Sequence, residues 1–188
     1  MRAFAGLPLP DAALDALERV QEGLAVGRHV PAENMHLTLA FLDDQPEAGL
    51  QTLHQFLGEI SAPPLQLTFS GLDTLGGKLP RVLAAQVQKT PELAHLRDRV
   101  RSACRTAGIE LPRERFRPHV TLARFPRHLE AVQVEKIARF LSATAQFGLE
   151  CEAASFALFQ STLAPEGARY DVLAQYPLSD IPPQRGYK

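Results

Sequence analysis

The sequence predicts an α+β protein with a largely antiparallel sheet, and three observations carry this prediction. Strand-like and helix-like segments mix along 188 residues without the strict alternation and glycine-rich turn of a nucleotide-binding βαβ fold. Hydrophobic residues make up 45% and charged residues 22% of the chain, as in an average globular protein. No low-complexity linker divides it. We therefore expect one domain over residues 1–180 and a Pro-rich, flexible tail at 181–188.

Four segments carry helical spacing of apolar residues together with start or stop signals. Asp11 is a candidate N-cap for the first. The third is the best marked, because Thr90 can cap it, Pro91 suits its first turn and Gly108 lies where a glycine ends a helix. The fourth places Val134 on the same face as two other aliphatic residues. The expected helices span residues 11–23, 46–58, 90–108 and 131–141. The strand-like runs between them span residues 2–7, 36–41, 65–72, 82–88, 116–125, 154–158 and 170–174.

Composition excludes several classes of protein. No run of 18 apolar residues exists, which excludes a membrane-spanning helix, and the opening residues read as a first strand instead of a signal peptide. Cys104 and Cys151 are far apart and form no Cys-x-x-Cys pair, so we expect a reducing, cytoplasmic compartment. A formal net charge of −1 argues against a protein that binds polyanions over its whole surface.

Positive charge is nevertheless concentrated in one segment. Residues 97–127 contain nine arginines against three acidic residues, a local net charge of +6. Two interpretations fit equally well at this point. The segment is either a solvated helix face followed by a polar loop, or a local positive field for a phosphate-bearing ligand.

One short pattern occurs twice. The run His-Leu-Thr-Leu-Ala-Phe beginning at His36 returns as His-Val-Thr-Leu-Ala-Arg beginning at His119, 83 residues later. In a strand, side chains alternate between faces, so each histidine shares a face with the threonine two residues on, about 6.6 Å away. The aliphatic residues between them face the core. If the two strands meet across a cleft, two imidazoles flank one ligand.

Two facing imidazoles suit general acid–base catalysis near neutral pH, one accepting a proton and the other donating one. Threonine hydroxyls can donate to an anion, and an arginine matches phosphate oxygens with two parallel hydrogen bonds. Cleavage of a phosphodiester without a metal needs these groups. A zinc site is the weaker alternative, because neither strand carries a further ligand on the histidine face.

At these residues the sequence resembles the two-histidine phosphoesterases and, more narrowly, the LigT-like RNA 2′,3′-cyclic phosphodiesterases. The likeness rests on residues 34–42 and 116–124, with support from the opening Arg-Ala-Phe and from residues 156–170. It implies a bilobal, pseudo-twofold α+β fold, with two mainly antiparallel sheets and flanking helices around a central cleft.

The resemblance also implies a reaction: metal-independent, cofactor-free opening of a 2′,3′-cyclic phosphate to a 2′-phosphate. His36 would protonate the departing O3′ and His119 would activate water. The same resemblance assigns phosphate binding to Thr38, Thr121 and Arg124. The partners would be RNA ends or nucleotides bearing the cyclic phosphate, with no membrane and no obligate protein partner. The two motifs are nearly identical, so the residues themselves leave acid and base unassigned.

This chain departs from the family pattern in two places. Asp43 stands where the family often has glycine, and Ala84 follows Arg-Val-Leu where many members carry an aromatic residue. Phe4 and Phe41 are candidates for replacing that aromatic contact, although Phe41 shares parity with the core residues and we expect it to pack in the core. Phe4 and Tyr170 are the candidate nucleotide contacts. Alternation likewise turns Arg124 away from His119 unless the strand bulges near Ala123.

Two other functions remain open from the sequence. One is hydrolysis of another small cyclic or linear phosphodiester, including trimming of RNA 3′ ends. The other is a non-catalytic module that binds RNA ends or nucleotides, although binding alone does not require two proton-transfer groups.

Overall fold

The structure, a computed structural model, describes residues 1–77, 79–164 and 167–179. The expected tail, 181–188, lies outside the described residues. The strands are β1 (Arg2–Pro8), β2 (Arg28–His29), β3 (His36–Asp44), β4 (Leu65–Leu75), β5 (Val82–Val87), β6 (His119–Arg124), β7 (Leu149–Ala153), β8 (Ser155–Ala164) and β9 (Gly167–Pro177). The helices are α1 (Asp11–Gln21), α2 (Glu47–Gly58), α3 (Pro91–Thr106) and α4 (Ala131–Ala143), with a 3₁₀ turn, η1, at Ala32–Asn34.

All strand pairs are antiparallel, which confirms the α+β prediction. The order is β7-β4-β5-β6-β3-β1-β8-β9, with β2 paired to β6. The two expected sheets, β7-β4-β5-β6 and β3-β1-β8-β9, are continuous, because β3 and β6 meet at one registered pair, Leu37 with Val120. The two motif strands are therefore direct neighbours at the centre of the molecule.

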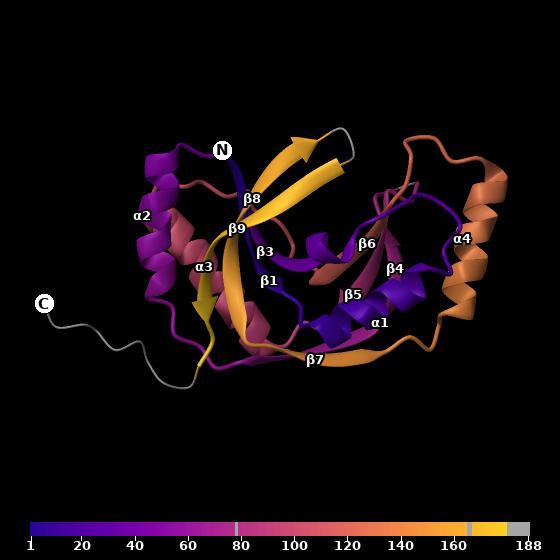
Figure 1. The fold of residues 1–188 in the computed structure, drawn as a ribbon, viewed down its shortest axis with the longest axis horizontal. Coiled ribbons are helices and arrows are strands. Elements are labelled where there is room, and N and C mark those ends of the chain that lie inside the picture. The colour runs from indigo at the N-terminus through magenta and orange to yellow at the C-terminus, as the bar shows by residue number, and fades with distance from the viewer. Residues whose placement is uncertain (78, 165–166, 180–188) are drawn as a thin grey trace, which may run out of the picture.

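Each half of the sheet is covered by a helix that follows a strand of the other half. Helix α1 follows β1 but packs against β6 and β7, and α3 follows β5 but packs against β3. Figure 1 shows α2 and α3 at one end of the molecule, α4 at the other and the strands between them. Because each half of the sheet is covered by a helix that follows a strand of the other half, the packing supports a single two-lobed domain, which remains a prediction.

Local sequence explains both ends of α3 but not the start of α1. The Thr90 side chain accepts a hydrogen bond from the Leu93 backbone N–H at 3.2 Å, and Gly108 follows α3 with φ +77°, so both signals of that helix are confirmed. Asp11 does not cap α1: it is the first helical residue, and Pro10 holds the N-cap position without a side-chain hydrogen bond.

Other segments differ from expectation for reasons of packing. The run at 116–125 forms a strand only from His119, and β2 and β7 were not predicted. Helix α4 buries Ile137 and Phe140 while Val134 stays 37% exposed, which moves its buried face by about one residue. No helix within the described ranges is long and apolar enough to span a bilayer.

Candidate active site

The backs of the two motif strands anchor the site. Leu37 and Val120 are fully buried, as are the leucines that follow the two threonines. Extending the Leu37–Val120 register by one residue each way sets His36 opposite Thr121, and Thr38 opposite His119. The two His/Thr pairs thus form one four-residue group on a rigid, packed support.

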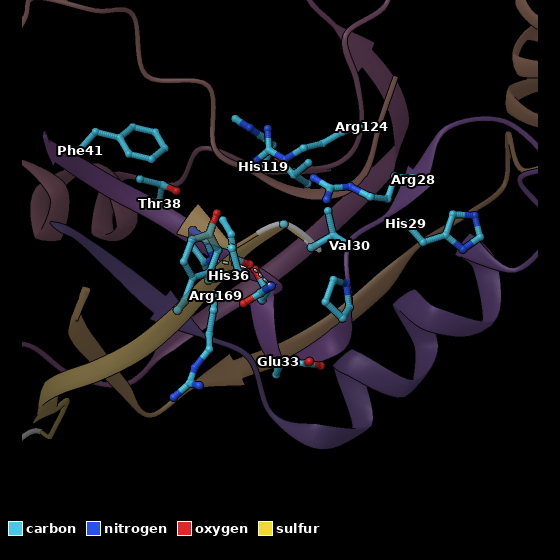
Figure 2. A pocket seen from close by; sticks show the side chains of 17 residues that line it. Arg28, His29, Val30, Glu33, His36, Thr38, Phe41, His119, Arg124 and Arg169 are labelled. Carbon is cyan, nitrogen blue, oxygen red and sulfur yellow. Dashed lines mark hydrogen bonds between the residues drawn. The ribbon is translucent and has the colours of Figure 1, made fainter. Parts of the chain in front are cut away.

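A cavity of about 330 Å³ lies over this group, a volume that suits a small ligand. All four side chains line it, and Figure 2 shows His36, Thr38, His119 and Arg124 gathered around one hollow. The structure therefore brings both predicted His/Thr pairs to one cavity.

Matching bulges in β3 and β6 bring one further side chain from each strand to the cavity. In β3, Ala5 pairs with Ala40 and Gly6 with Thr38, so Leu39 is an extra residue in the ladder. In β6, Leu122 is the equivalent extra residue between the partners of Leu83 and Ala84. Each bulge reverses the alternation beyond it, so the fifth residue after each histidine returns to the cavity face.

Arg124 and Phe41 are these two residues. Arg124 lines the cavity. The strand has the bulge near Ala123 that this orientation was expected to need. Phe41 lines it too and is 56% exposed, so the expectation that Phe41 packs in the core is wrong. The sequence carries a signal for this: in both motifs two consecutive buried residues, Leu and Ala, interrupt the alternation.

The bulge in β6 is held by a buried glutamine. Gln21 Nε2 donates to the backbone carbonyl of Leu122, and the Val30 backbone N–H donates to the same oxygen at 2.7 Å. A buried carbonyl displaced from a ladder is thereby satisfied. Strand β2 then continues beside β6 where β3 has diverged, and it sets Arg28 directly opposite Arg124. A two-residue strand gives no sequence signal, so Arg28 was missed.

Both imidazoles are fixed in the same way. His36 Nδ1 donates to the Asn34 carbonyl oxygen and His119 Nδ1 to the Arg117 carbonyl oxygen, each at 2.8 Å. Because a carbonyl can only accept, Nδ1 carries the hydrogen in both rings. Nε2 is therefore the nitrogen left for a ligand, with a lone pair when the ring is neutral and a proton when it is charged.

Asn34 does more than orient His36. Its side-chain Nδ2 donates to the Ala168 carbonyl oxygen at 2.7 Å, which ties η1 to strand β9. That strand carries Tyr170 into the cavity wall. The sequence pattern included Asn34 in the first motif without a role, and only the fold supplies one.

Aromatic rings surround one side of His36. Phe4 stacks on the imidazole at a centroid distance of 4.4 Å, and Tyr170 meets it edge-on at 5.1 Å. Phe4 is only 2% exposed, so it supports His36 and offers no open face to a base, contrary to its candidacy as a nucleotide contact. Tyr170 is half-buried and lines the cavity, in keeping with its candidacy.

This environment favours neutral His36. Its pKa is lowered from 6.5 to about 4, chiefly because burial disfavours the charged ring, and nearby Arg124 and His119 lower it as well. The hydrogen bond to the Asn34 carbonyl opposes the shift. A ligand that brings negative charge to the cavity favours the protonated ring in turn.

Asp43 lies just beyond Phe41 in a left-handed conformation, with φ +54°. Glycine adopts this conformation without steric cost and aspartate tolerates it, but a β-branched side chain does not. We expect Asp43→Val to lower the free energy of unfolding by about 1–2 kcal/mol, and Asp43→Gly not to lower it. Urea denaturation followed by circular dichroism measures both. Because the side chain is exposed, equal stability of the two variants would refute this backbone argument.

The model of the 2′-5′ RNA ligase superfamily matches residues 9–163. Among curated proteins, an RNA 2′,3′-cyclic phosphodiesterase of Thermus thermophilus is 32% identical over 95% of this chain and 90% of its own length. One of Geobacillus stearothermophilus is 29% identical over 97% of this chain, which spans 59% of that protein's length.

A solved structure agrees with the fold. The apo form of Escherichia coli LigT superposes with a TM-score of 0.75 over 95% of this chain and 97% of that chain, at 23% identity. The α+β fold with a largely antiparallel sheet that the sequence predicts is therefore confirmed. Because the family model covers most of the sequence and both His/Thr motifs, the chain belongs to the 2′-5′ RNA ligase superfamily, the two-histidine phosphoesterases.

Proposed function

We propose that this protein hydrolyses RNA or nucleoside 2′,3′-cyclic phosphates to 2′-phosphates, by general acid–base catalysis without a metal. One observation carries the proposal: two imidazoles with their Nδ1 atoms bonded to main-chain carbonyls line the same cavity with two threonines and an arginine. The names of the curated relatives support the same reaction.

In the reaction, neutral His119 Nε2 takes a proton from water, and the water oxygen attacks phosphorus. The bond between phosphorus and O3′ breaks, and protonated His36 gives its Nε2 proton to O3′. The 2′-phosphate remains. Arg124 and the hydroxyls of Thr38 and Thr121 stabilise the charge that develops on the phosphate oxygens.

The low pKa of His36 bears directly on this assignment. A general acid must hold a proton at the start of the step, and in the free site the ring is neutral at pH 7. The negative charge of the bound phosphodiester opposes the burial that lowers the pKa, so substrate binding and protonation of His36 are coupled. The free site thus becomes competent as the anion enters.

The exposed face of Phe41 and the ring of Tyr170 border the phosphate site and offer flat surfaces for a base. Phe41 thus supplies the aromatic surface that the sequence does not have after Arg81-Val82-Leu83. We place the reaction in the cytoplasm, a location supported by the free thiols of Cys104 and Cys151.

A substrate panel tests the proposed reaction. Purified protein is incubated with 2′,3′-cyclic and 3′,5′-cyclic nucleotides, with and without EDTA, and ³¹P NMR identifies the products. We expect only the 2′,3′-cyclic compounds to be opened, with 2′-phosphates as the sole products and no effect of the chelator. Loss of activity in EDTA that zinc restores, or binding without turnover, would contradict the proposal.

A further inference from the structure

A second groove opens from the candidate active site past His119. It has a volume of about 680 Å³ and shares Thr38, Phe41 and His119 with the catalytic cavity. Residues 74–77, at and just after the end of β4, and residue 80, shortly before β5, also line it. A ligand bound between the two histidines can therefore extend into this groove without crossing the protein.

Three arginines of the positively charged segment line this groove, and the proposed reaction uses none of their side chains. They are Arg97 on α3 and Arg115 and Arg117 on the segment before β6. Arg115 and Arg117 are exposed, and their guanidinium groups make no hydrogen bond or ion pair within the described ranges. Both side chains line the same groove.

Arg97 is held differently. It is only 7% exposed, and its guanidinium lies 4.5 Å from the centre of the Phe116 ring. Glu114 Oε1 approaches it at 3.7 Å but also approaches Arg101 at 4.0 Å, so one half-exposed carboxylate is shared by two cations. Arg97 Nε is buried with no hydrogen-bond partner among the described residues. A buried donor without an acceptor is costly, so Arg97 is kept in place by its contacts with Phe116 and Glu114, and its positive charge contributes to the groove wall.

The groove wall thus carries three guanidinium groups against one carboxylate. A polynucleotide that ends in a cyclic phosphate carries one negative charge per nucleotide along the strand leading away from it, and arginines bind such phosphates. We propose that this groove binds the backbone phosphates of single-stranded RNA upstream of the cyclic end. The proposal rests on the proposed function and names the part of the substrate that the catalytic cavity does not hold.

Another hollow, of about 530 Å³, also borders Phe41, and its charged lining residues are Arg2, Arg28, Arg124 and Asp43. It is the competing route for the strand. Arg28 and Arg124 already line the catalytic cavity, so this hollow adds one arginine to it, whereas the groove beside His119 adds three and is therefore favoured. Alanine at Arg2 therefore distinguishes the two routes.

The test compares kcat/KM for 2′,3′-cyclic UMP with kcat/KM for a hexauridylate ending in a 2′,3′-cyclic phosphate. We expect the wild type to prefer the hexamer by roughly tenfold at low salt. Arg115→Ala should lower that preference by about fivefold and reduce the salt dependence of the hexamer reaction by roughly 0.7 in log–log slope. Arg113→Ala is the matched control, because Arg113 is exposed on the same segment and does not line the groove.

The outcomes separate the two proposals. Hydrolysis of both substrates with no preference for the hexamer, or a preference that Arg2→Ala abolishes and Arg115→Ala leaves intact, overturns the groove assignment alone. Failure of the wild type to open either substrate overturns the proposed function and the groove assignment with it. If Arg113→Ala lowers the preference as much as Arg115→Ala does, the assignment is also overturned. The effect would then come from the net positive charge of the segment and not from contacts in the groove.

Discussion

Replacing His119 with alanine is expected to lower kcat on a 2′,3′-cyclic nucleotide by about 10²–10⁴-fold, and His36→Ala should have an effect of similar size. Each substitution removes one of the two groups that move protons in the proposed reaction. The proposed phosphate contacts from Thr38, Thr121 and Arg124, which line the cavity, remain, so both variants should still bind a 2′-nucleotide. Steady-state rates and isothermal titration calorimetry measure the two properties separately.

Because the two imidazoles act in one concerted exchange of protons, their effects should not add. We expect the double variant to be little slower than the slower single variant. His128→Ala is the control, since His128 is exposed and lies outside the cavity. A single variant that keeps its rate within tenfold of wild type would refute a proton-transfer role for that histidine, and loss of binding in both would favour a purely structural role.

The sequence predicted the paired motifs well because strand periodicity is a local property. It wrongly favoured core packing for Phe41 because periodicity fails at a bulge. A ladder irregularity is set by the partner strand, here β1 for Leu39 and β5 for Leu122, and the partner is unknown before the fold. The same reasoning that required a bulge for Arg124 applied to Phe41, since both lie five residues after a motif histidine.

Residues that reach the site through non-local contacts could not be predicted at all. Arg28 lies on a strand of two residues that exists only because β6 offers an open edge there. Phe4 looked like a surface for a base, yet the neighbouring strands β3 and β8 bury it behind His36. The arginine-rich segment could be counted from the sequence, but only the fold divides it between the catalytic cavity and the adjoining groove.

The lowered pKa of His36 has a consequence for stability that is independent of turnover. In the unfolded chain a histidine titrates near 6.5, and in the folded protein His36 titrates near 4. Between pH 6.5 and pH 4, His36 is therefore mostly protonated in the unfolded state and mostly neutral in the folded state. The free energy of unfolding therefore falls as the pH drops from 6.5 to 4, and at pH 4 the loss reaches about 3 kcal/mol.

His36→Gln removes this titration, so its free energy of unfolding should fall less than that of the wild type between pH 6.5 and pH 4. His95→Gln, at an exposed position on α3, should keep the wild-type dependence. Urea denaturation at several pH values measures all three proteins. Parallel curves for wild type and His36→Gln would show that the pKa of His36 is not lowered in the folded protein.

The same group links stability to catalysis through inorganic phosphate, the simplest anion that fits the cavity chemistry. If His36 is the acid, phosphate must raise its pKa, because the anion opposes the positive field of Arg124 that helps to keep the ring neutral. An NMR titration of the His36 Cε1–H resonance, with and without phosphate, should show this rise. A pKa that stays near 4 in saturating phosphate would leave His36 neutral in the complex, and it would then be the base, with His119 as the acid.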